Sequence, residues 1–137
     1  MKFIDANVFI RYLTNDDPAR ARACFEFFQR LKRGEDEATI VEAILSEVVY
    51  VLSSPQLYNL SPSDIRSRLG PLLVLKGLKL REKRLYLKAL DIYASHPFLD
   101  FEDALAVTHM GAAGITEILS YDRDFDRLPG IRRIEPT

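Results

Sequence analysis

Short apolar segments of strand length alternate along this chain with longer segments that carry helix start and stop signals. Asp17-Pro18 and Ser61-Pro62 each place a capping side chain before an early proline, a usual opening of a helix, and Gly34 is a usual helix end. Because strands separated by helices pair in parallel, the alternation predicts an α/β sandwich around a short, mainly parallel sheet. The expected strands are 2–5, 38–41, 116–120 and 131–134; the expected helices are 18–33, 42–52, 61–75, 81–95, 101–113 and the short turn 123–128.

Composition favours one ordinary folded domain over residues 1–137. The chain is 47% hydrophobic, which is enough for a core, and it shows no repeat or linker. No apolar run approaches the roughly 18 residues of a membrane span, so no membrane partner is expected. The N-terminus lacks a small-residue cleavage site, and Cys24 has no second cysteine to pair with. We therefore expect a cytoplasmic protein.

Four carboxylates are placed in apolar surroundings, just after strands or in helices. Asp5 follows the first strand, Asp103 begins the helix 101–113, and Asp122 follows the strand 116–120. Glu47 lies in a helix that is apolar on nearly every side, and burying its charge requires a cation, an arginine or a proton. Since ligands bind at the carboxyl ends of parallel strands, these acids are expected to converge there.

Each of these acids also has a structural interpretation. Asp5 is suited to cap the next helix, and Asp103 to favour its own helix through the helix dipole. Glu47 fits a narrow exposed seam beside Ser46, and Asp122 fits an ordinary turn with Asp124. The sequence alone leaves both sets of interpretations open.

A cluster of like charges requires cations, and Mg²⁺ or Mn²⁺ suits oxygen ligands best. Such a site activates a bound water and stabilises a phosphate during in-line displacement. No histidine and cysteine spacing indicates zinc, and His96 and His109 are expected to have packing or surface roles. The absence of GxGxxG and P-loop motifs argues against a nucleotide cofactor.

A basic stretch in the middle of the chain is the main charge feature, since the net charge is only −1. Such a stretch is either a solvated helix face or a surface that binds nucleic-acid phosphates. Its members, interrupted only by the acid Glu82, are Lys76, Lys79, Arg81, Lys83, Arg84 and Lys88.

Four motifs together resemble the PIN-domain ribonucleases, and among them the VapC-like toxins of type II toxin–antitoxin systems. The motifs are IDANVFIRYLTNDDP, SEVVYVL, DFEDALAV and LSYDRDFDRLPGI, and they span nearly the whole chain in the family's order. The resemblance implies a PIN-like α/β sandwich and metal-dependent endonucleolytic cleavage of RNA. It also implies a homodimer and a cognate antitoxin protein that covers the active site.

The resemblance also implies a set of site residues. The metal-binding and catalytic acids would be Asp5, Glu47, Asp103 and Asp122. Asn7 would support the site by hydrogen bonds, as would Ser120, where the family often has threonine; Asp124 is either a further member or a structural acid before Phe125.

Three other functions remain open at this point. A phosphoryl-transfer enzyme would use Asp5 as nucleophile, although Asn7 stands where such enzymes normally place a second acid. A non-catalytic RNA- or protein-binding module would share the fold. A housekeeping RNA-processing nuclease would share both the fold and the chemistry.

Overall fold

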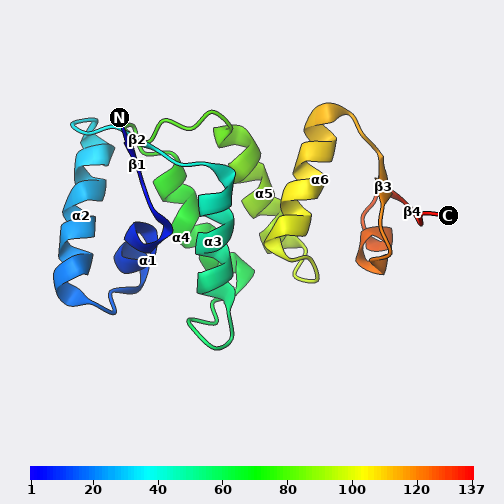
Figure 1. Cartoon of the computed structure of the whole chain (residues 1–137), viewed down its shortest axis with the longest axis horizontal. Coiled ribbons are helices and arrows are strands. Elements are labelled where there is room, and N and C mark those ends of the chain that lie inside the picture. Colours follow the sequence, from blue (N-terminus) through cyan, green and yellow to red (C-terminus); the bar gives the residue numbers. More distant parts are fainter.

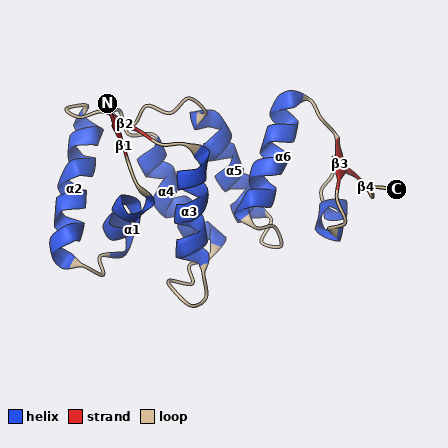
Figure 2. Ribbon diagram, viewed as in Figure 1, coloured by secondary structure: helices blue, strands red, loops and turns tan.

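The computed structural model describes residues 1–137 as an α/β protein (Figures 1 and 2), which confirms the fold class. All the expected helices and strands form, with ends shifted by a few residues, and residues 6–14 form one further helix directly after Asp5. In chain order the elements are β1 (Lys2–Phe3), α1 (Ala6–Thr14), α2 (Pro18–Arg33), β2 (Ala38–Thr39), α3 (Glu42–Ser53), α4 (Pro62–Leu73), α5 (Lys83–Ser95), α6 (Phe101–Ala113), β3 (Glu117–Leu119), the 3₁₀ helix η1 (Arg123–Arg127) and β4 (Arg132–Ile134).

Side chains cap the helices where the sequence predicts it. The carboxylate of Asp17 accepts a hydrogen bond from the N–H of Arg20, and the hydroxyl of Ser61 accepts one from the N–H of Asp64. Gly34 ends α2 in the left-handed region at φ 74°, a conformation that costs glycine little. Local sequence therefore fixes where these helices begin and end.

The main hydrophobic core lies among β1, β2 and the helices. Its largest fully buried side chains include Phe9, Phe28, Leu45, Leu69 and Leu90. These residues come from α1 to α5, and Phe101, Ala104 and Leu105 of α6 belong to the same cluster, so the core holds all six α-helices together. None of the helices combines the length and the apolar composition needed to cross a membrane.

The strands are parallel, as predicted, but they form two separate pairs where a single central sheet was expected. β1 pairs with β2, and Leu78 extends this pair through a parallel bridge to Ala38. β3 pairs with β4. Figure 1 shows why the pairs do not meet, because β3 and β4 lie at one end of the long axis, and α3, α5 and α6 lie between them and β1.

Residues 117–134, which we call the C-terminal unit, pack against the start of α6. Leu99, Phe125 and Leu128 form a small separate cluster there. The Arg127 guanidinium lies 3.7 Å from the ring centroid of Phe98 and adds a cation–π contact. The C-terminal unit is thus fixed to α6 and not to β1.

Candidate functional site

Asp103 is the carboxylate with the most perturbed environment. It lies in the first turn of α6, and its backbone N–H donates to the carboxylate of the cap residue Asp100 at 2.8 Å. Burial, followed by the negative charges of Asp100, Asp122 and Asp124, raises the pKa of Asp103 to about 6. A carboxylate held in this way favours a proton or a cation.

The loop after β3 brings the two C-terminal acids to Asp103. Asp122 caps η1, with its carboxylate accepting from the Asp124 N–H at 2.9 Å. The Asp122 N–H in turn donates to the Ser120 hydroxyl oxygen at 3.0 Å. The Ser120 hydroxyl therefore helps to fix the turn that carries both acids.

Asp5 occupies the N-cap position of α1, but its side chain accepts no capping hydrogen bond. The residue is exposed directly after β1, and Asn7 is exposed in the first turn of α1. The carboxylate of Asp5 is therefore not committed to the capping interpretation and can bind a ligand.

The prediction that Glu47 is a buried carboxylate is wrong. The helix α3 buries the stripe of Leu45, Val48 and Leu52, while Glu47 lies on the opposite, exposed face with Tyr50, which is 71% exposed. No other element of the chain buries the Glu47 side chain. The exposed seam beside Ser46 is the interpretation that the structure supports.

Glu47 faces a hollow of about 630 Å³ between α3 and α6. Glu102 and His109 line the same hollow from α6, and a His109 ring nitrogen lies 2.7 Å from a carboxylate oxygen of Glu42. Because Asp103 follows Glu102 by about 100° around the helix, its side chain leaves α6 in a different direction.

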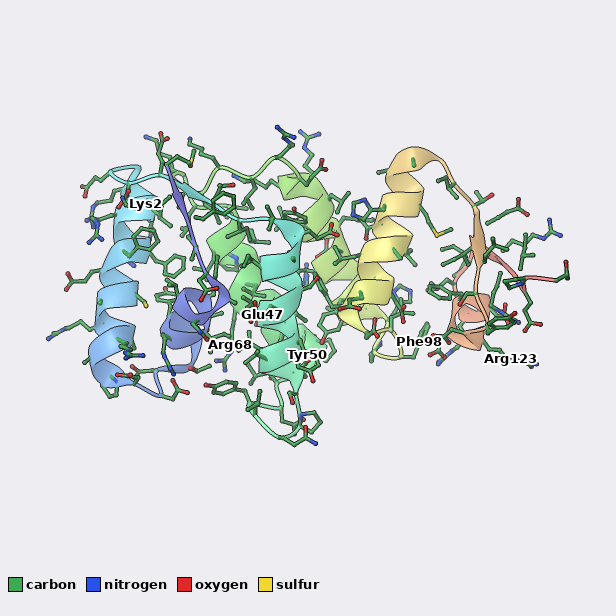
Figure 3. All side chains as sticks on the ribbon, viewed as in Figure 1. Lys2, Glu47, Tyr50, Arg68, Phe98 and Arg123 are labelled. Atoms are coloured by element: carbon green, nitrogen blue, oxygen red, sulfur yellow. The ribbon has the colours of Figure 1, made fainter.

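The structure therefore divides the predicted site into two parts. Asp103, Asp122 and Asp124 interact electrostatically, whereas Asp5 and Glu47 belong to the other part, around β1 and α3. Figure 3 shows Glu47 and Arg123 of η1 on opposite sides of α6. Nowhere do three acids, histidines or cysteines lie close enough together to hold a metal ion. The carboxylate oxygens of the predicted ligands suit Mg²⁺. In this arrangement, however, a single chain does not bring those carboxylates together.

One contributor to the site was missed by the sequence reasoning. Asp100 is the N-cap of α6, and its charge is the largest electrostatic influence on Asp103. The spacing of Asp100 and Asp103 predicts this influence, because residues three apart at a helix start lie on the same turn and their charges interact.

The basic stretch lies mainly on the connection into α5 and on its first turns. Arg84 and Lys88 line a hollow of about 930 Å³ together with the C-terminal end of α6. On α6 this hollow is lined by residues from Val107 onward, so it lies C-terminal to Asp103 along the helix. At 1.5 Å per residue, the ten residues from Asp103 to Ala113 span about 15 Å.

Fold and site together define a class: an α/β domain of short parallel strands in which carboxylates gather at strand ends and at a helix start. A family model described as the PIN domain matches residues 2–131. The chain belongs to the PIN domain family, whose members generally have a metal-dependent nuclease fold. No individual curated protein matches the sequence.

Asp103→Asn is expected to stabilise the metal-free protein by about 1 kcal/mol at pH 7.5, a figure reduced for the partial exposure of the side chain. The folded-state pKa of about 6 is above the ordinary value of 3.8, so the folded state binds this proton more tightly than the unfolded state. The destabilisation is present above pH 6 and disappears as the pH falls towards 4. Urea unfolding in EDTA at pH 7.5 and 4.5 measures it.

Glu102→Gln, in the same helical turn, is the control for this measurement. An equal stability gain in both variants, or a gain from Asp103→Asn that is undiminished at pH 4.5, would show that ionisation of Asp103 is not the source of the destabilisation.

Proposed function

We propose that this protein is a metal-dependent endoribonuclease and the toxin of a type II toxin–antitoxin pair. The observation that carries the proposal is the partly buried Asp103 carboxylate, on which the negative charges of Asp100, Asp122 and Asp124 act. Such a concentration of negative charge is stabilised by a divalent cation, and membership of the PIN family supports a nuclease. The four motifs spread along the chain support the narrower assignment to a VapC-like toxin.

Mg²⁺, or Mn²⁺, is the proposed cofactor, because every proposed ligand is a hard carboxylate oxygen. The proposed ligands are Asp5, Glu47, Asp103 and Asp122, with Asn7, Ser120 and Asp124 as supporting residues. The bound cation would supply charge stabilisation at the phosphate and an activated water. Of the supporting residues, Ser120 already orients the turn that carries Asp122 and Asp124.

RNA is the proposed substrate and a cognate antitoxin the proposed protein partner. Purified protein incubated with a mixed pool of cellular RNA is expected to produce discrete cuts with Mg²⁺ or Mn²⁺ and none with EDTA. Restoration of cutting by excess Mg²⁺ after EDTA is the control for chelation. Cutting that continues in EDTA would overturn the metal-dependent mechanism. Absence of cutting, together with absence of metal binding by calorimetry, would favour the non-catalytic binding module.

The basic stretch is proposed to bind the RNA backbone at a distance from the carboxylates. Reversing Arg84 and Lys88 to glutamate is expected to weaken RNA binding about tenfold or more at low salt and to flatten its salt dependence, because each lost phosphate contact lowers the slope by about 0.7 for single strands. Fluorescence anisotropy over a salt series measures this. The matched control reverses Arg22 and Lys32 on α2, which lie outside the proposed surface. An unchanged slope would remove the stretch from the interface.

A further inference from the structure

The strand β1 has one hydrogen-bonding edge that pairs with nothing. The N–H groups of Lys2 and Ile4 donate to β2, to the carbonyls of Glu37 and Thr39 at 3.2 and 3.1 Å. In a parallel pair successive residues direct their backbone groups to alternate edges, so Phe3 directs its N–H and C=O away from β2. The Phe3 side chain is 70% exposed. An unpaired strand edge with an exposed aromatic residue is a template for another strand.

The strand β3 has a matching free edge. Its backbone bonds to β4 use the Thr116 carbonyl, which accepts from Arg132, and the Ser120 N–H, which donates to Ile134. By the same alternation Glu117 and Leu119 direct their backbone groups to the free side. Leu119 is 70% exposed there, although the small apolar cluster covers its neighbour Ile118 on the other face.

The two free edges carry complementary residues when β1 and β3 run in the same direction. The two parallel pairs then become one continuous parallel sheet. Hydrogen-bond parity allows Phe3 to lie opposite Thr116, Ile118 or Ser120. The Ile118 register aligns Ile4 with Leu119 on the same face and Lys2 with Glu117. This pairing covers Leu119 beside the buried Ile4 and sets opposite charges next to each other.

Within one chain, β1 and β3 cannot pair unless the packing around α6 is disrupted. A short connection, residues 114–116, joins β3 to α6, and the C-terminal unit is packed on the start of that helix. The helix α6 in turn packs against α5 and α3, which separate it from β1 (Figure 1). Bringing β3 to the β1 of its own chain would break the packing of the C-terminal unit on α6, or the packing of α6 on α5 and α3. The β1 strand of a second copy can reach β3 while α6 stays in place.

We propose that two copies of this chain exchange strand edges, with β3 of each copy paired to β1 of the other. The exchange is reciprocal, as two-fold symmetry requires, and it removes both free edges. The carboxyl ends of the joined strands then meet, so Asp5 of one copy lies next to Ser120 and the adjoining Asp122 of the other. Each carboxylate site, whose nuclease role rests on the proposed function, is thus shared: Asp5 and Glu47 come from one copy, Asp103 and Asp122 from the other.

Cysteine cross-linking tests the strand pairing without reference to activity. In a Cys24→Ser background, Lys2→Cys combined with Glu117→Cys is expected to form covalent dimers under mild oxidation, because paired strand positions lie within the reach of a disulfide. Both positions are exposed, so folding is not at risk. The matched control combines Lys2→Cys with Arg132→Cys, one strand further away at about 10 Å, and is expected to remain monomeric on a non-reducing gel. A cross-linked monomer, equal cross-linking in the control, or no cross-link in the folded variant would overturn the proposal.

Complementation tests the shared site. Asp5→Asn and Asp103→Asn, each inactive alone, are mixed after unfolding and refolding together. Half of the dimers are then mixed, and each has one intact site, so about a quarter of the wild-type cleavage is expected. If each site lies within one chain, every site contains a substitution and cleavage stays absent. Failure of the proposed nuclease function is separable, because the wild type would then be inactive while the cross-linked dimer still forms.

Discussion

Asp103→Asn is expected to lower RNA cleavage by about a thousandfold, because loss of a charged ligand removes several kcal/mol of metal-dependent charge stabilisation and each 1.36 kcal/mol is tenfold in rate. The substitution keeps the size of the side chain and the backbone N–H that bonds to Asp100. The fold and the helix start should therefore survive. Initial rates on a labelled RNA, with and without Mg²⁺, measure the effect.

The same variant tests the assignment as a toxin. Induced expression of the wild-type chain in a bacterial host is expected to arrest growth, and expression of the Asp103→Asn chain is not. Glu26→Gln, which changes an exposed acid on α2, is the control and should behave as wild type. Cleavage that persists in Asp103→Asn would exclude this carboxylate from the chemistry. Active cleavage without growth arrest would favour a housekeeping RNA-processing nuclease.

Gly77→Ala is expected to cost about 3 kcal/mol of folding stability and to lower the melting temperature by roughly 10 °C. A Cβ at this position would lie 2.1 Å from the carbonyl oxygen of Asp36 and 2.9 Å from that of Leu31. Both obstacles are backbone atoms, which cannot rotate away. A shift of the chain would also weaken the bonds that Gly77 makes with Leu31 and Ala38, at 2.8 and 2.9 Å.

Gly111→Ala is the matched control, because an added Cβ in α6 meets nothing within 4 Å. Its expected effect is a gain of about 0.5 kcal/mol from helix propensity. Thermal unfolding followed by circular dichroism compares the two variants. Equal melting temperatures would show that the segment around Gly77 adjusts at little cost.

Much of the candidate site could be anticipated, since acids after strands and at helix starts are visible in the chain. The charges of Asp122 and Asp124 act on Asp103, but Asp5 and Glu47 do not join them, so the expected convergence of four acids is not found within one chain. The environment of Glu47 could not be anticipated. The apolar residues around Glu47 are typical of a fully buried helix. Only the neighbouring elements decide which face of the helix is covered, and in this chain they leave Glu47 exposed.

Local sequence determined the helices and strands of this protein, because caps, prolines, glycines and apolar periodicity act over a few residues. It also determined which residues carry charge beside apolar segments. Tertiary structure decided the pairing of the strands and the grouping of the acids. The hydrogen-bond partners of a strand lie far away in sequence. The residue pattern that predicts β1 and β3 as strands is the same whether the second edge of each strand is paired or free. The packing of the C-terminal unit on α6 placed Asp103 and Asp122 together and left Asp5 with the other half of the fold.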